Sequence, residues 1–149
     1  MTEPMDPEVE RQLGVDLFNE VWALMENPAR TADEDLRMIH SAHASRLHWE
    51  QVGGPEHRAR GEWQCSRMYA VLGRAEPSQY HAERCLSICQ ENGIGDWDLA
   101  FAYEALARAS KVAGDAAEQA RWLSLAREAT ASVADDDDRE AVEQDLADL

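Results

Sequence analysis

Three of the five histidines in the sequence fall within the eleven residues from Ile39 to Trp49, IHSAHASRLHW. Histidine binds metal ions and transfers protons near neutral pH, so this segment is the first candidate for a chemical site. On a helix, however, His48 lies roughly 140° around the axis from His43, and His40 lies about 60° from it. The three imidazoles therefore cannot converge on one ion from a single helix.

At helical spacing, His43 shares an apolar face with Leu36, Ile39 and Leu47, which predicts that this face is buried. We expect a neutral, inward His43 that hydrogen-bonds across a helix interface. His40 and His43 could supply two metal ligands, but zinc needs further ligands and the sequence assigns none.

A pocket between helices that contains His43, Arg46 and Glu62 is an alternative site. It would suit a small-molecule sensor or an enzyme. A third interpretation places His43 and Arg46 at the rim of the same surface as Trp63.

The three cysteines suggest a second metal site, because Cys85 and Cys89 follow His81 at steps of four, and Cys65 lies on the preceding helix. Zinc accepts such ligands. Free cysteine also packs as a small hydrophobe, and that is the interpretation we favour. An odd number of cysteines without framework spacing indicates reduced thiols in a cytoplasm. We predict no metal and no cofactor.

Arg60, Trp63 and Arg67 step by three and four residues, so they share one face of a helix. Arginine beside an aromatic ring suits a carboxylate or phosphate ligand, because stacking and bidentate hydrogen bonds are both available. The alternative is that both arginines form solvated ion pairs. Their candidate partners are nearby acids such as Glu56, Glu62 and Glu104.

These residues require helices to position them, and the sequence predicts an all-α chain with seven helices. Apolar residues recur at three and four, and no alternation of period two is found. Capping and turn residues set the boundaries. The predicted helices run from Pro7 to Glu26 after an Asp6 cap, from Asp33 to Val52, from Pro55 to Gly73, from a first turn holding Pro77 to Asn92-Gly93, from an Asp96 cap to Gly114, from an Asp115 cap onward, and from the acidic run Asp135 to Asp138 to the end.

The chain of 149 residues has the size of one domain, residues 1–149, and carries a net charge of −16. Such an acidic chain disfavours nucleic acid and anionic membranes as partners. No apolar run is long enough to span a membrane, and the acidic start does not resemble a signal peptide, so we expect a cytoplasmic protein. Only Lys111 among 14 basic residues is a lysine, which suggests a GC-rich bacterial source.

The sequence also repeats internally. Two helices correspond at a separation of 41 residues, and the helices after them correspond at 37. The first pair matches Cys65, Ser66, Tyr69 and Gly73 with Leu106, Ala107, Ser110 and Gly114. The second pair matches Ala82, Leu86 and Cys89 with Gln119, Leu123 and Ala126.

This pattern resembles the tetratricopeptide repeat family, over about residues 58–130. The segment YEALARASKVAGDAAEQARWLSLAREA is similar at Tyr103, Leu106, Ala107, Gly114, Asp115, Leu123 and Ala126. It departs from the family at Ser110 and Gln119, and EWQCSRMYAVLG is a weaker match. The repeats exceed the family length of about 34 residues, which indicates a divergent relative.

The resemblance implies a right-handed array of three antiparallel helical hairpins with a C-terminal capping helix, and a concave groove that binds a peptide segment. It places Arg60, Trp63, Gln64, Arg67, Phe101, Glu104 and Arg108 on that groove. We therefore expect a non-catalytic module for a protein or peptide partner, with a groove suited to an acidic or carboxylate-bearing segment. Reversing Arg67 to glutamate should abolish partner capture and leave the thermal midpoint nearly unchanged.

No nucleophile elbow, phosphate loop, zinc-protease motif or dinucleotide fingerprint occurs, so nothing supports an enzyme. The four aspartates from Asp135 are expected to cap a helix, because the spaced ligands of a calcium loop are missing. Five tryptophans are many for this length and are compatible with self-association through apolar outer faces.

Overall fold

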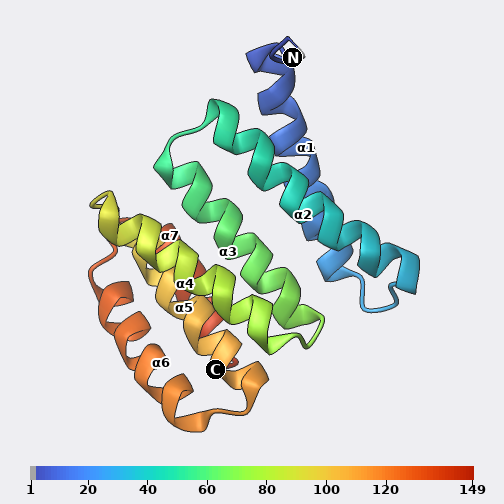
Figure 1. Ribbon diagram of the computed structural model, residues 1–149. Coiled ribbons are helices and arrows are strands. Elements are labelled where there is room, and N and C mark those ends of the chain that lie inside the picture. Colours follow the sequence, from blue (N-terminus) through green and yellow to red (C-terminus); the bar gives the residue numbers. More distant parts are fainter. Residues whose placement is uncertain (1–2) are drawn as a thin grey trace.

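The chain folds into α-helices joined by short turns in the computed structural model, which describes residues 3–149 (Figure 1). Residues 1–2 of the predicted domain lie outside this range. No strand is found between residues 3 and 149. The helices are α1 (Pro7–Glu26), α2 (Ala32–Val52), α3 (Pro55–Val71), α4 (Ala75–Glu91), α5 (Asp96–Ala113), α6 (Ala116–Ala131) and α7 (Asp136–Leu146). The all-α prediction is confirmed.

Side-chain caps explain where several helices begin. Asp6, Asp115 and Asp135 each accept hydrogen bonds from backbone N–H groups of the first turn that follows, as predicted. Thr31 and Glu34 form a reciprocal capping box, so α2 begins one residue before the predicted Asp33.

The predicted cap of α5 was wrong. Gly95 occupies the N-cap position, and Asp96 is the first helical residue, with φ of 53°. The Asp96 carboxylate instead accepts a hydrogen bond from the N–H of Ala134, at 3.1 Å. Asp96 therefore ties the start of α5 to the turn before α7, a distant contact that local capping rules do not anticipate.

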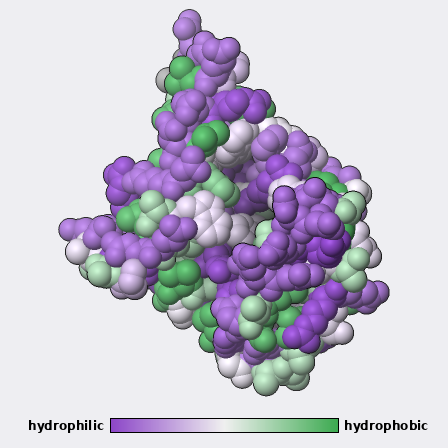
Figure 2. Space-filling view, turned by 180° about the vertical axis from the view of Figure 1, so that it is seen from behind, coloured by the Kyte–Doolittle hydropathy of each residue, from purple (hydrophilic) through white to green (hydrophobic). Residues whose placement is uncertain are grey.

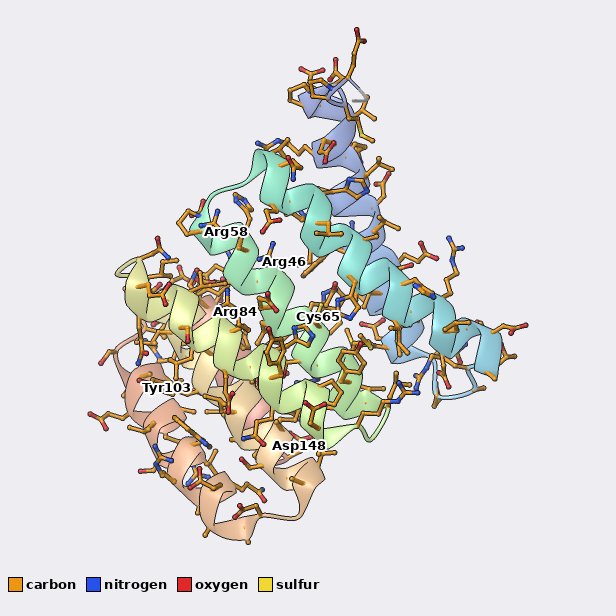
Figure 3. The ribbon with its side chains drawn as sticks, viewed as in Figure 1. Arg46, Arg58, Cys65, Arg84, Tyr103 and Asp148 are labelled. Carbon is orange, nitrogen blue, oxygen red and sulfur yellow. The ribbon has the colours of Figure 1, made fainter. Side chains whose placement is uncertain are left out.

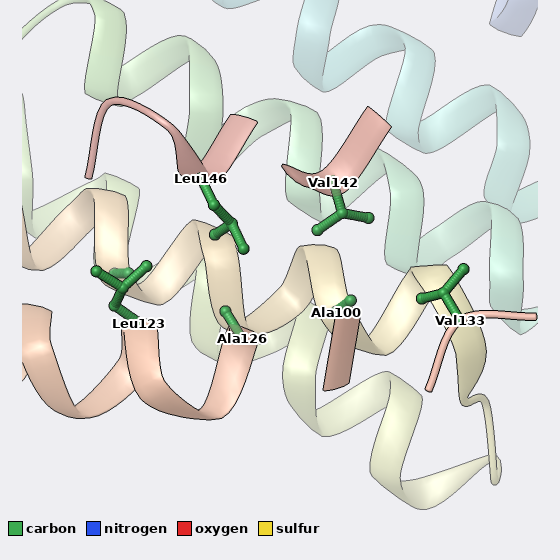
Figure 4. Close-up of a cluster of buried hydrophobic side chains, with 7 residues drawn as sticks. Ala100, Leu123, Ala126, Val133, Val142 and Leu146 are labelled. Carbon is green, nitrogen blue, oxygen red and sulfur yellow. The ribbon is translucent and has the colours of Figure 1, made fainter. Parts of the chain in front are cut away.

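The helices pack as three hairpins, α1 with α2, α3 with α4, and α5 with α6 (Figure 1). Helix α3 also contacts α1 and α5, so these first helices of the hairpins lie side by side. Helix α7 packs against α5 and α6. In Figure 4 its Val142 and Leu146 face a buried cluster that includes Ala100, Leu123 and Ala126. The short last helix thus closes the apolar surface of the third hairpin.

The predicted apolar face of α2 was wrong in its direction. Leu36 and Leu47 are 54% and 61% exposed. The buried face instead carries Met38, Ser41, Ala42 and Ser45. Three of these four residues are small because α2 approaches α1 closely. The Ser45 hydroxyl, for example, donates to the carbonyl of Gly14 at 2.7 Å. Met38 is the one large apolar side chain among these four buried residues of α2.

Candidate functional site

The first candidate site is a groove between α1, α3 and α5. It consists of two adjoining cavities of about 340 and 240 Å³ that share Phe18 and Arg60 in their walls. The larger cavity is lined by Phe18, Trp22, Ala59, Arg60, Trp63, Cys85, Trp97, Asp98 and Phe101. The smaller one adds Val15, Asn19, Trp49, His57 and Gly61. Figure 2 shows a hollow on this side of the molecule, bordered by hydrophilic side chains.

Aromatic rings form a continuous wall in the larger cavity. The Trp63 ring lies 5.5 Å from Trp22 and 5.4 Å from Phe101, centroid to centroid. Phe101 in turn lies 6.2 Å from Trp97, edge to face. These rings come from three helices, so the wall exists only in the packed fold. It offers an apolar side chain a preformed surface.

Arg60 stands at the rim of this wall. Its guanidinium makes two 3.0 Å hydrogen bonds to the carboxylate of Asp98 and lies 4.4 Å above the ring of Trp97. The Arg60 side chain is 37% exposed, compared with 11% for Asp98. The predicted pairing of Arg60 with an acid is therefore correct in kind, although Glu56 and Glu62 are not its partners.

Glu104, predicted to face a ligand, is fully buried and collects three donors. Trp63 Nε1 donates to one oxygen at 3.0 Å, while Arg67 and Arg108 donate to the other at 3.1 and 2.6 Å. Arg108 also donates twice to Asp148, at 3.0 Å each. The arginines predicted to bind an external anion are thus held by carboxylates of the chain itself.

The electrostatics of this internal network follow from its burial. Burial raises the pKa of Glu104, and the charges of Arg108 and Arg67 oppose that rise. Burial would lower the pKa of Arg108, but hydrogen bonds to Asp148 and the charge of Glu104 outweigh it and raise that pKa. Such a network is costly to break, because each group would remain buried without a partner.

Gln64 was also predicted to lie on the groove, and this placement was wrong. Its side chain is 1% exposed and lies between α3 and α1, where Nε2 donates to the carbonyl of Phe18 at 2.9 Å. Phe101 and Trp63, by contrast, both line the larger cavity as expected. Helical position alone does not separate a groove residue from one at the interface with the neighbouring hairpin.

The second candidate site lies on the other side of α3, between α2 and α4 (Figure 3). The structure brings His43, Arg46 and Glu62 together here, as the alternative interpretation proposed. Arg46 Nε donates to Glu62 at 3.3 Å. His81 from α4 joins them, with Nδ1 only 2.6 Å from the second oxygen of Glu62. We name this the Glu62–His81 cluster; it comprises His43, Arg46, Glu62, Tyr69 and His81.

Sequence reasoning missed His81 and Tyr69 as members of this cluster. His43 Nε2 lies 2.8 Å from the Tyr69 hydroxyl, and the rings of Tyr69 and His81 stack with centroids 5.7 Å apart. The signal that could have found them is the hairpin register. Ser66 contacts Ser78, so one turn earlier on α3, Glu62 must face the region of His81.

Burial and neighbouring charges shift the pKa values of two groups in the Glu62–His81 cluster, Glu62 and His43. Burial would raise the pKa of Glu62, but the hydrogen bond from His81 and the charges of Arg46 and Arg84 lower it below the ordinary value. Burial lowers the pKa of His43, and the neighbouring His81 adds to this effect. His43 therefore favours the neutral form and contacts Tyr69 across the α2–α3 interface, as predicted.

The remaining histidines and cysteines are dispersed. His40 is exposed, and His48 contacts Glu10 on α1 at 3.3 Å. Cys65, Cys85 and Cys89 are buried free thiols, and burial raises the pKa of Cys65 to about 12. Among residues 3–149, no three His, Cys, Asp or Glu side chains gather in a metal-binding arrangement. Over the same range, no helix has both the length and the apolar composition of a membrane span.

Comparison with protein-family models, with curated proteins and with solved structures finds no match to the chain.

Proposed function

We propose that the protein is a non-catalytic, tetratricopeptide-like binding module that captures a protein or peptide segment in the groove between α1, α3 and α5. The observation that carries this proposal is the larger cavity, about 340 Å³, with aromatic walls supplied by three different helices. In such a module the first helices of successive hairpins line the binding surface. Here α1, α3 and α5 lie next to one another and form the cavity walls.

Two further features support the repeat character. Gly73 and Gly114, which correspond in the internal repeat, have φ of 73° and 74°. Cys65 and Leu106, which also correspond, are 0% and 2% exposed. The equivalent positions thus perform equivalent structural tasks in the second and third hairpins. Helix α7 packs against α5 and α6 and brings Asp145 and Asp148 to Arg67 and Arg108.

Fewer arginines are available to a ligand than the sequence suggested. Arg67 and Arg108 are 21% and 11% exposed and are bound to Glu104, whereas Arg60 is 37% exposed at the cavity rim. We expect the bound segment to place an apolar side chain among Trp22, Trp63 and Phe101. A carboxylate on the same segment would reach Arg60 and share its guanidinium with Asp98. Most of the affinity then comes from apolar burial.

A displayed random-peptide library, selected on the wild-type protein, tests this function. Selected peptides should carry an apolar residue near a carboxylate, and Trp22→Ala should weaken them by about tenfold or more, because a cavity wall is lost. Trp122→Ala is the matched control, since Trp122 is also partly buried but packs on Tyr103 outside the groove. Peptides that bind Trp22→Ala as tightly as the wild type would refute the proposal.

A further inference from the structure

Cations gather beside the Glu62–His81 cluster, on the side of α3 away from the groove. Arg46 belongs to the cluster, and Arg84 on α4 is close enough to Glu62 to lower its pKa. Figure 3 shows Arg46, Arg58 and Arg84 near one another on this face, from α2, α3 and α4. A chain with 30 acidic and 14 basic residues places few such groups of arginines by chance.

The register of the α3–α4 hairpin supports the position of Arg58. Glu62 contacts His81, and one turn later on α3 Ser66 contacts Ser78. The two helices are antiparallel, so one turn earlier on α3, Arg58 faces the stretch of α4 around Arg84. At this level of the hairpin Ala59 and Cys85 are buried together, and Arg58 and Arg84 are their neighbours in the chain, one turn from the histidine.

These cations exceed the acids that face them. Arg46 contacts Glu62 at 3.3 Å and Glu50 at 3.5 Å. Neither Arg58 nor Arg84 forms an ion pair with any acidic side chain of residues 3–149. Glu62 carries a single negative charge and already contacts both Arg46 and His81. Adjacent guanidinium groups repel one another unless an anion lies between them.

His81 adds a directed hydrogen-bonding atom to this surface. Its Nδ1 is fixed by the Glu62 carboxylate at 2.6 Å, which sets the orientation of the ring. Over residues 3–149, no protein group makes a hydrogen bond with the other ring nitrogen, Nε2. The side chain is 14% exposed, so a ligand from solvent can reach it. When both ring nitrogens carry protons, Nδ1 donates to Glu62 and Nε2 can donate to an anionic ligand.

An aromatic ring borders the same place. Tyr80 is 55% exposed, and its ring stands edge to face with His81 at 5.1 Å between centroids. An exposed tyrosine next to arginines offers a flat surface to the organic part of a ligand, while the guanidinium groups bind its anionic part.

We propose that this face, formed by Arg46, Arg58, His81 and Arg84 with Tyr80 at its edge, binds the phosphoryl group of a small phosphorylated molecule. Guanidinium groups match phosphate oxygens in pairs, and the phosphate supplies the negative charge that the neighbouring acids do not. The site is separate from the proposed peptide groove, because Arg58 lies roughly 140–160° around α3 from Trp63 and Arg60. None of the residues of the site lines either cavity of the groove.

Calorimetric titration with inorganic phosphate, at an ionic strength held constant with chloride, tests the proposal. We expect saturable binding to one site, and Arg84→Gln should weaken it about tenfold through loss of a charge-assisted contact. Arg84 is exposed and forms no ion pair with residues 3–149, so the fold should be unaffected. Arg121→Gln on α6, where Arg121 is 58% exposed, is the matched control and should bind phosphate as the wild type does.

Three results would overturn the proposal. These are a response to acetate as strong as that to phosphate, unchanged binding in Arg84→Gln, or an equal loss in Arg121→Gln. Phenyl phosphate then identifies the source of the phosphoryl group. If phenyl phosphate binds more tightly than inorganic phosphate, and Tyr80→Ala removes that difference, the ligand is a phosphate ester. If both compounds bind equally, the ligand is free phosphate at the same site.

Discussion

Reversal of Arg67 to glutamate should destabilise the protein strongly, in contrast to the expectation from the sequence. Arg67 donates to Glu104 at 3.1 Å, and that carboxylate is 0% exposed. The variant would replace this contact with two carboxylates facing each other, next to Asp145, which lies 3.7 Å from Arg67. Arg67 is therefore part of the buried network around Glu104, and its main contribution is to the stability of the fold.

The magnitude follows from the exposure of the two groups. Removing one partner of a buried ion pair costs about 3–5 kcal/mol. Arg67 is 21% exposed and Arg108 remains beside Glu104, so we expect the lower end, about 3 kcal/mol. For a chain of this length each kcal/mol lowers the midpoint by about 2–4 °C, which gives a fall of about 10 °C.

Urea unfolding followed by circular dichroism measures this loss. Arg121→Glu is the control, because it makes the same change of charge at a side chain that is 58% exposed and should alter the free energy of unfolding by no more than about 0.5 kcal/mol. The reasoning is wrong if Arg67→Glu unfolds within that margin of the wild type.

The pH dependence gives a second measurement of the same contact. Burial raises the pKa of Glu104, and Arg67 is one of the groups that hold it down. Without Arg67 the folded-state pKa rises further, so the folded variant binds more protons than its unfolded chain. The deficit of Arg67→Glu relative to the wild type should therefore shrink as the pH falls through that pKa. A deficit that stays constant would contradict the assignment.

Three other predictions concern single residues. Burial lowers the pKa of His43 below its value of 6.5, so the unfolded chain binds the proton more tightly; stability should fall as the pH drops below 6.5, and His43→Gln should reduce this slope in urea unfolding. A Cβ atom at Gly14 would lie 2.8 Å from Nε1 of Trp49, so Gly14→Ala should lower the free energy of unfolding by about 1–3 kcal/mol. An unchanged free energy would show that α1 moves away to make room. Thr31→Ala removes the capping box of α2 and should cost about 1 kcal/mol by the same measurement, and an unchanged stability would show that the cap contributes nothing.

Local features of the fold were predictable from the sequence. Proline, glycine and aspartate mark the helix ends because their backbone and side-chain requirements are short-range, and α1 and α6 begin where Asp6 and Asp115 predict. Asp96 shows the limit of this reasoning. Its partner Ala134 is 38 residues away, so only the tertiary structure reveals why its carboxylate does not cap its own helix.

The candidate site was predictable as a set of helix faces and not as a set of contacts. Helical spacing predicts that Arg60 and Trp63 share one face of α3, and both line the larger cavity. Whether Arg67 faces a ligand or Glu104 depends on how closely α5 and α7 approach α3, which periodicity does not encode. The same limit applies to His81, whose role follows from the α3–α4 register.

The ring contact between Trp22 and Trp63 makes the groove observable without a label. Two indoles with centroids 5.5 Å apart couple their electronic transitions, and the coupling changes sharply with their separation and tilt. One ring is carried by the first hairpin and the other by the second. Any molecule that wedges between these hairpins, or any motion that parts them, should therefore alter the near-ultraviolet circular dichroism of the unmodified protein.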